Sequence, residues 1–131
     1  MNEDDRYEQG MEVRRAVLGD AYVERTLEKR TPFNEEFQRF ITRYAWGTAW
    51  ADETLPRHTR SLVTVALMVA LGHHDELRLH LRAALRNGVS QDEIKALLLH
   101  CAIYAGVPPA NTAFHIAEEV FAEHAAENEH R

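Results

Sequence analysis

The segment Gly72–His80 concentrates more groups capable of chemistry than any other part of the chain. It places three imidazoles and two carboxylates within the eight residues 73–80. Because side chains three and four positions apart share a helix face, His73, Glu76 and His80 are expected to lie along one stripe. A histidine and a carboxylate one turn apart can transfer a proton or hold a metal ion.

The pair His80 and Glu76 favours proton transfer. A carboxylate one turn away can orient an imidazole and stabilise its charged form. The alternatives are a core histidine beside Leu77 and Leu81, or a surface ion pair at i, i+4 spacing. A metal site would need three or four ligands, and no fourth ligand is evident beside His73, Glu76 and His80, so we expect no metal.

A basic cluster begins the next upstream helix and suits an anionic ligand. Arg57, His58 and Arg60 lie where backbone N–H groups at a helix start also favour anions. A guanidinium binds a carboxylate through two parallel hydrogen bonds. Arg60 is the more inward candidate and Arg57 the second, whereas a surface helix start is the simpler interpretation for His58.

His100 and Tyr104 form a further candidate pair, one turn apart on an apolar helix. We expect His100 to be an interior histidine paired with a backbone carbonyl, with substrate contact through His100 and Tyr104 as the alternative. Cys101 lies beside them. It is the single cysteine, so the chain has no Cys-x-x-Cys motif.

The helix signals are plentiful and strand signals almost absent, which predicts an all-α fold of six or seven helices. The long apolar run Leu62–Leu71 predicts a central, buried helix. Asp20 and Asn34 are predicted N-caps, and Ser90 with Glu93 forms a predicted capping box. The expected helices cover residues 3–18, 21–29, 35–50, 57–71, 75–86, 94–105 and 110–126, followed by a charged tail at about 127–131.

Composition narrows the class of protein. The chain has 131 residues, 45% apolar and 27% charged, which fits a single globular domain over 1–131. A net charge of −6 argues against nucleic-acid binding. The acidic N-terminus is unlike a signal peptide, and Leu62–Leu71 is too short to span a bilayer. We therefore expect a cytoplasmic protein without membrane contact.

Several short motifs together resemble the carboxymuconolactone decarboxylase family, over about Asp20 to Glu123. They are Arg60-Ser61-Leu62, Ala70-Leu71-Gly72, Glu76-Leu77-x-x-His80, Ala84-x-x-x-Gly88-Val89-Ser90-x-x-Glu93-Ile94 and Tyr104-Ala105-Gly106-Val107-Pro108. The stretches Thr31-Pro32-Phe33-Asn34 and Trp46-Gly47 resemble the members that act on 4-carboxymuconolactone. The resemblance implies an alkylhydroperoxidase-D-like helical fold.

The same superfamily includes disulfide reductants that carry Cys-x-x-Cys-x-x-x-His on the corresponding helix. If His80 takes the place of that histidine, His73 and Glu76 stand where the two cysteines would be. This chain therefore cannot run a dithiol cycle, although it keeps a residue that can transfer protons.

The resemblance implies cofactor-independent decarboxylation of 4-carboxymuconolactone to 3-oxoadipate enol-lactone in the protocatechuate branch of the β-ketoadipate pathway. It assigns proton transfer to His80 and Glu76, and substrate binding to Arg60, Arg57, His100 and Tyr104. It also implies a homo-oligomer, a trimer or hexamer, acting on a small lactone dicarboxylate. The alternatives are a non-enzymatic protein that binds a small acid, and a peroxidase-system reductase that has lost its cysteine pair.

Overall fold

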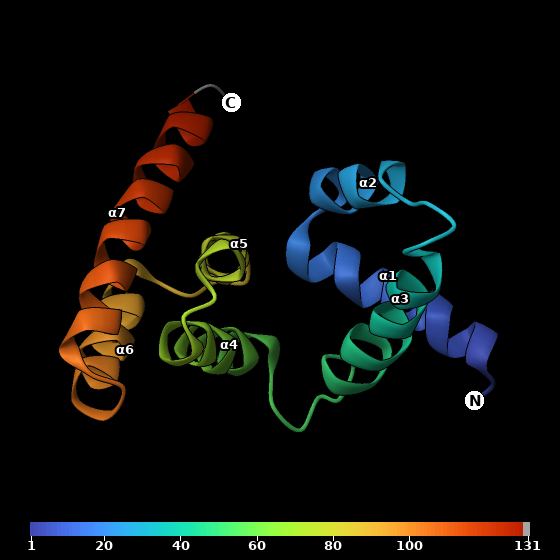
Figure 1. The fold of residues 1–131 in the computed structure, drawn as a ribbon, viewed down its shortest axis with the longest axis horizontal. Helices are drawn as coiled ribbons and strands as arrows, with labels where there is room; N and C mark the ends of the chain where they lie inside the picture. The colour runs from blue at the N-terminus through green and yellow to red at the C-terminus, as the bar shows by residue number, and fades with distance from the viewer. Residues whose placement is uncertain (130–131) are drawn as a thin grey trace. The chain divides into compact units, whose positions relative to one another are not determined.

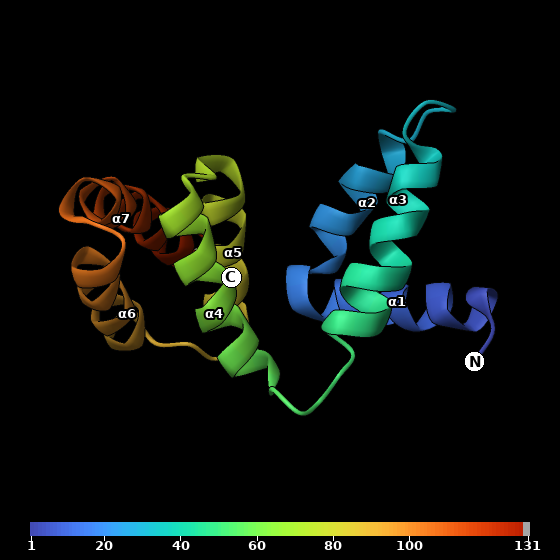
Figure 2. The same cartoon turned by 60° about the horizontal axis from the view of Figure 1, so that its bottom comes forward.

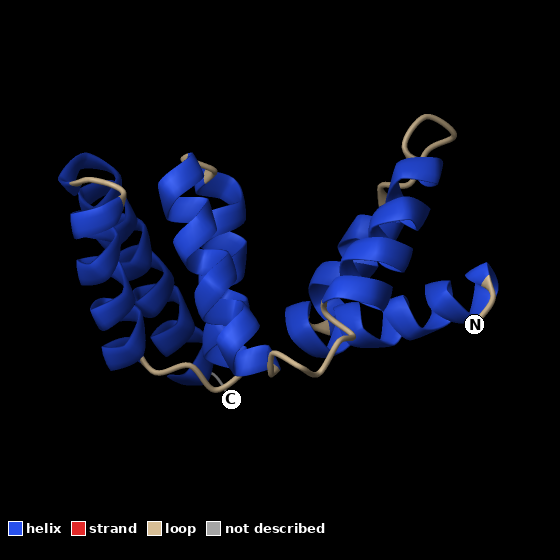
Figure 3. Ribbon diagram, turned by 90° about the horizontal axis from the view of Figure 1, so that it is seen from below, coloured by secondary structure: helices blue, strands red, loops and turns tan. Residues whose placement is uncertain are grey.

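The computed structural model describes residues 1–129 and contains only helices within that range (Figures 1 and 3). The all-α prediction is confirmed. The chain forms two compact units, Met1–Arg57 and His58–Arg131. The first contains α1 (Glu3–Leu18), α2 (Asp20–Glu28), α3 (Glu35–Ile41) and the π-helix η1 (Thr42–Ala49); the second contains α4 (Arg57–Leu71), α5 (His74–Arg86), α6 (Gln91–Tyr104) and α7 (Val107–Glu129).

In the first unit, α1 crosses η1 at very close range. A Cβ on Gly10 would lie 1.9 Å from the carbonyl oxygen of Thr42, and one on Gly47 would lie 2.5 Å from that of Arg6. Only glycine at both positions permits this approach. The predicted helix 35–50 is present, but its second half has π-helix geometry. In it, Trp50 N–H donates to the Ala45 carbonyl, five residues back.

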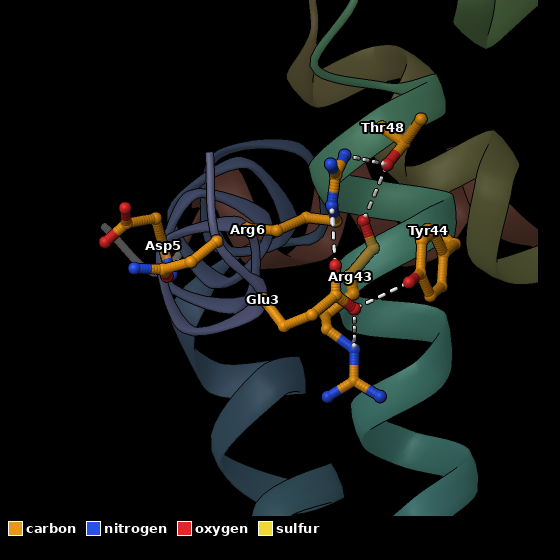
Figure 4. A network of polar contacts seen from close by, with 7 residues as sticks. Glu3, Asp5, Arg6, Arg43, Tyr44 and Thr48 are labelled. Atoms are coloured by element: carbon orange, nitrogen blue, oxygen red, sulfur yellow. Dashed lines mark hydrogen bonds and ion pairs between the residues drawn. The ribbon is translucent and has the colours of Figure 1, made fainter.

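A polar network holds the start of α1 against η1 (Figure 4). The Glu3 carboxylate accepts a 2.6 Å hydrogen bond from the Tyr44 hydroxyl and lies 3.3 Å from Nε of Arg43 and of Arg6. Arg6 also donates to the Thr48 hydroxyl at 3.0 Å. Because these partners are mostly exposed, we expect the network to fix geometry more than stability.

The second unit is built around α7, which packs against both α5 and α6. In Figure 2, α6 and α7 run side by side. The core draws on all four helices of the unit, and its fully buried members include Val65, Leu77, Leu81, Leu98 and Val120.

Helix ends follow the local sequence in most places. Gly72 has φ +73° and ends α4, and His73 N–H then donates to the Met68 carbonyl at 3.0 Å. The capping box of Ser90 and Glu93 is present in full. The last helix begins at Val107 rather than at Ala110, since prolines fit the first helical turn. It also continues to Glu129, through the described part of the predicted charged tail.

Of the predicted caps, Asp20 is wrong, and Asn34 stands at the predicted position without the predicted capping bond. Gly19 occupies the N-cap of α2, and the Asp20 carboxylate instead lies 3.2 Å from Arg15. Asn34 occupies the N-cap of α3 but makes no capping bond. Its side chain is used in the preceding turn, where it accepts from Thr31 N–H and donates to the Lys29 carbonyl.

The prediction that α4 is buried all round is also wrong. Ser61, Val65 and Val69 are buried, whereas Val63, Leu67 and Leu71 are about half exposed. A helix that packs along one stripe leaves its opposite face open whatever the composition of that face. The apolar character of Val63, Leu67 and Leu71 is therefore not explained by packing within the core of the second unit.

Candidate functional site

The predicted proton-transfer pair lies on α5 in the second unit. His80 is partly buried between the core positions Leu77 and Leu81, while Glu76 is exposed one turn earlier. Burial lowers the pKa of His80 from its ordinary value, and the negative charge of Glu76 partly offsets that effect. The structure thus places a largely neutral imidazole beside a carboxylate that can favour its protonation.

His73 and His74 do not share this environment. His73 is the N-cap of α5 and His74 is its first residue, and both side chains are exposed. Over residues 1–129, no group of three or more His, Cys, Asp and Glu side chains is arranged to hold a metal ion.

The two candidate arginines differ in burial. Arg60 is partly buried in the first turn of α4, within the second unit. Arg57 is exposed, belongs to the first unit, and lines an open cleft of about 640 Å³ there together with Trp50, Glu12, Asp52 and Glu53. Three carboxylates around that cleft make Arg57 the weaker candidate for holding an anionic substrate.

The expectation that His100 is an interior histidine is wrong. His100 is exposed, and its ring packs against that of Tyr104, with centroids 4.9 Å apart. Tyr104 is 81% exposed and Ile103 is 78% exposed. The helix turns its buried stripe, Ile94, Leu98 and Cys101, the other way. His100 and Tyr104 therefore stand on an open apolar face of α6.

Cys101 is poorly suited to thiol chemistry. Its side chain is buried in the core of the second unit, and burial raises its pKa. The thiolate is the nucleophilic form, so a raised pKa suppresses its reactivity. Cys101 acts as a small core residue.

Sequence reasoning missed the partner of His58. Its Nε2 atom lies 2.9 Å from Oε2 of Glu93, the acid of the α6 capping box. The Ser90 N–H and the His58 ring both lower the pKa of Glu93. Each residue had a local explanation in the sequence, and no spacing rule connects positions 35 residues apart.

Comparison with known proteins identifies the family. The family model described as "Carboxymuconolactone decarboxylase family" matches residues 35–119, which include α4, α5 and α6. The chain belongs to the carboxymuconolactone decarboxylase family. The family resemblance inferred from the motifs is thereby confirmed.

Two of three similar relatives match more of the chain than the family model does. A 4-carboxymuconolactone decarboxylase of Acinetobacter baylyi is 59% identical over 121 residues, covering 92% of this chain and 90% of that protein. A nitrosuccinic acid decarboxylase of Metarhizium robertsii is 41% identical, covering 86% of this chain and 79% of that protein. A 4-carboxymuconolactone decarboxylase of Pseudomonas putida is 64% identical over 47 residues, 36% of this chain and 98% of that sequence.

None of the described helices is long and apolar enough to cross a membrane.

Proposed function

We propose that the protein is a carboxy-lyase that converts 4-carboxymuconolactone to 3-oxoadipate enol-lactone and CO₂, in the protocatechuate branch of the β-ketoadipate pathway. The observation that carries the proposal is the 59% identity, over nine-tenths of both chains, with a 4-carboxymuconolactone decarboxylase. The expected cytoplasmic location is part of the same proposal.

The proposed chemistry uses an electron sink within the substrate. The departing carboxylate sits on the γ-carbon of an unsaturated lactone. When the C–C bond to that carboxylate breaks, its electron pair moves through the C=C bond to the lactone carbonyl oxygen. The resulting dienolate then takes a proton at its α-carbon. No external electron acceptor is consumed, which is why we propose that the reaction needs no cofactor.

His80 is the proposed proton donor, tuned by Glu76. Burial lowers the pKa of His80, so the imidazole is mostly neutral near pH 7 in the free protein. A bound dicarboxylate brings negative charge near the ring and favours its protonated form. Substrate binding would thus load the proton that the dienolate later receives. A positioned acid of this kind contributes about 10²–10⁴-fold to rate.

Arg60 is the proposed holder of the carboxylate that stays on the substrate, with Arg57 as the second candidate. Arg60 is a partly buried residue in the first turn of α4, where the helix dipole favours anions and a guanidinium matches a carboxylate through paired N–H groups. His100 and Tyr104 are proposed to contact substrate from the exposed face of α6. In that role the substrate would also have to contact residues from outside α6, because α6 alone leaves these two side chains exposed.

A homo-oligomer, a trimer or hexamer, is part of the proposal. Two helices of the second unit carry large exposed apolar side chains, and contiguous patches of this kind mark interaction surfaces. They are Val63, Leu67 and Leu71 on α4, and Leu99, Ile103 and Tyr104 on α6. Sedimentation equilibrium should give a multiple of the chain mass, and Ile103→Asp should lower it.

The decisive experiment mixes purified protein with 4-carboxymuconolactone and follows CO₂ release together with enol-lactone formation. Turnover that persists after exhaustive chelation supports a metal-independent carboxy-lyase. Saturable binding without turnover would support the non-enzymatic alternative, a protein that binds a small acid. A thiol-dependent peroxidase assay tests the reductase alternative, against which the buried Cys101 counts.

Nitrosuccinic acid is a second candidate substrate, favoured by the 41% identical relative. Its nitro group, like the unsaturated lactone, can accept the electron pair left by a departing carboxylate. We expect 4-carboxymuconolactone to have the higher kcat/KM, because the identity to the relative named for it is 59%. Parallel assays of the two acids decide between them.

A further inference from the structure

A buried arginine in the first unit has no role in the chemistry described above. Arg14 lies on α1 and is only 4% exposed. It is four residues from Gly10, where α1 and η1 approach most closely, and it shares the buried side of α1 with Val13 and Val17. The close crossing therefore encloses a guanidinium.

The groups that contact this guanidinium are uncharged. Arg14 Nη1 lies 3.3 Å from both Gln38 Oε1 and Thr42 Oγ1, and Nη2 lies 3.4 Å from the same Gln38 oxygen. The Thr42 hydroxyl in turn donates to the Gln38 carbonyl at 2.7 Å. The amide and the hydroxyl orient the guanidinium without neutralising its charge.

One edge of the guanidinium is not used by these contacts. The Nε atom is buried and has no hydrogen-bond partner in the part of the chain that the structure describes. The Gln38 oxygen accepts from both terminal nitrogens, so it occupies the edge between them. The remaining edge, formed by Nε–H and the second Nη2–H, matches the two oxygens of a carboxylate.

Among the described residues, no carboxylate contributes to the electrostatic environment that shifts the pKa of Arg14. The titratable groups that interact with it electrostatically are the phenols Tyr22 and Tyr7, and burial lowers its pKa. By contrast, the neighbouring Arg15 lies within salt-bridge distance of both Asp20 and Glu24. Burying an uncompensated charge is strongly unfavourable. An anion that pairs with the Arg14 guanidinium would therefore stabilise the folded protein.

We propose that the Nε–Nη2 edge of Arg14 is a binding site for the carboxylate of a small organic acid. Because Nε itself is buried, a carboxylate reaches this edge only when the side chains that cover it move aside. Arg14 belongs to the first unit, whereas His80, Glu76 and Arg60 belong to the second. The site is thus additional to the chemistry assigned to His80, Glu76 and Arg60.

The test observes the guanidinium itself in the full-length protein. Sodium acetate, the smallest carboxylate probe, is titrated while the Nε–Hε signal of Arg14 is followed by ¹H–¹⁵N NMR. We expect a saturable downfield shift of Hε, because Nε–H, which has no acceptor within residues 1–129 of the free protein, would donate to a carboxylate oxygen. Sodium chloride at matched ionic strength should leave the signal in place.

Matched variants of adjacent residues provide the control. Arg14→Lys keeps the charge but removes the paired edge, so acetate affinity measured by calorimetry should fall about tenfold or more. Arg15→Lys alters a partly exposed, ion-paired neighbour and should bind acetate as the parent does. If Arg14→Lys does not fold, the NMR titration of the parent still decides the question.

Three results would overturn the proposal. The first is an Arg14 signal that shows no saturable change with acetate. The second is a shift of equal size with chloride. The third is the same shift on raising the protein concentration without added acid, which would assign the edge to a carboxylate of a second copy.

Discussion

The Nε2 atom of His58 lies 2.9 Å from Oε2 of Glu93, which joins the first turn of α4 to the capping box of α6. Glu93 also accepts a 3.0 Å hydrogen bond from Ser90 N–H. One carboxylate thus caps its own helix and fixes the start of another. Since Arg60 lies in the same first turn of α4 as His58, this contact also positions the proposed substrate-binding residue.

The first prediction concerns acid stability. The pKa of Glu93 is lowered in the folded protein, so its contribution is present above the ordinary value of 4.5 and is lost as the pH falls through the folded pKa. Glu93→Gln should therefore lower the unfolding midpoint at pH 7 and reduce the loss of stability below pH 4.5. Denaturant unfolding from pH 7 to pH 3 measures both effects.

The control for this prediction is Asp92→Asn, which changes the neighbouring exposed carboxylate in the first turn of α6. It should leave the acid transition nearly unchanged. An equal loss of stability in Glu93→Gln and Asp92→Asn would mean that the helix dipole, and not the contacts of Glu93 with Ser90 and His58, is responsible.

The second prediction concerns the pH dependence of catalysis. The pH profile of kcat/KM reports ionisations of the free enzyme. Burial lowers the pKa of His80 and Glu76 raises it, so Glu76→Gln should lower that pKa further. The inflection assigned to His80, expected below pH 6.5 in the parent, should move to lower pH in the variant. Steady-state kinetics between pH 4.5 and pH 8 would show the displacement.

Asp75→Asn is the matched control, because Asp75 is an exposed carboxylate on the same turn of α5. We expect it to leave the inflection in place, while His80→Ala should lower kcat about 10²–10⁴-fold. A folded His80→Ala protein with near-normal kcat would remove His80 from the mechanism.

The third prediction separates Arg60 from Arg57. Lysine keeps the positive charge but loses the paired donors that match a carboxylate. Arg60→Lys should raise KM about tenfold with a smaller change in kcat, as expected for loss of a charge-assisted contact. Arg57→Lys, at an exposed position, should have little effect. The reverse pattern would transfer the binding role to Arg57.

The fourth prediction tests the close crossing of α1 and η1. Gly10→Ala places a Cβ 1.9 Å from the Thr42 carbonyl oxygen, so the two helices must separate. We expect a cost of about 3 kcal/mol or more, at the upper end for an overpacked contact. Gly72→Ala meets no atom within 4 Å and should cost about 1–2 kcal/mol, from its positive φ alone. Equal costs by denaturant unfolding would contradict this account.

The helices could be predicted from the sequence because their signals are local. The capping box at Ser90 and the helix predicted over 57–71 depend on residues within a few positions, and both are confirmed. Burial could not be predicted in the same way. The apolar composition of α4 indicated a central helix, but packing uses only the stripe of Ser61, Val65 and Val69.

The candidate site shows the same division between local and long-range information. His80 and Glu76 share one turn, so their spacing indicated a pair, and their electrostatic coupling agrees with it. The contact of His58 with Glu93 spans two helices and left no local signal. For Arg14 a signal did exist, since Gly10, Arg14 and Val17 share one face of α1. A charged residue that shares a helix face with a glycine and a valine indicates a buried charge.

The last prediction concerns the face of the ring that receives the proton. Loss of CO₂ leaves a planar dienolate, and an acid fixed on α5 reaches one face of it, whereas bulk water reaches both. Turnover in D₂O should therefore place one deuterium at the α-carbon of the enol-lactone, on a single face. Glu76→Gln should slow this step while leaving substrate binding largely intact, so kcat should fall more than KM changes.

Prompt trapping of the product is essential, since later exchange with solvent would scramble the label. NMR of the trapped lactone distinguishes the two faces, and Asp75→Asn should give the same stereochemistry as the parent. If both faces carry equal deuterium, solvent protonates a released dienolate and His80 is not the donor. The pair of His80 and Glu76 would then act earlier, for example by hydrogen bonding to the lactone carbonyl as charge develops on it.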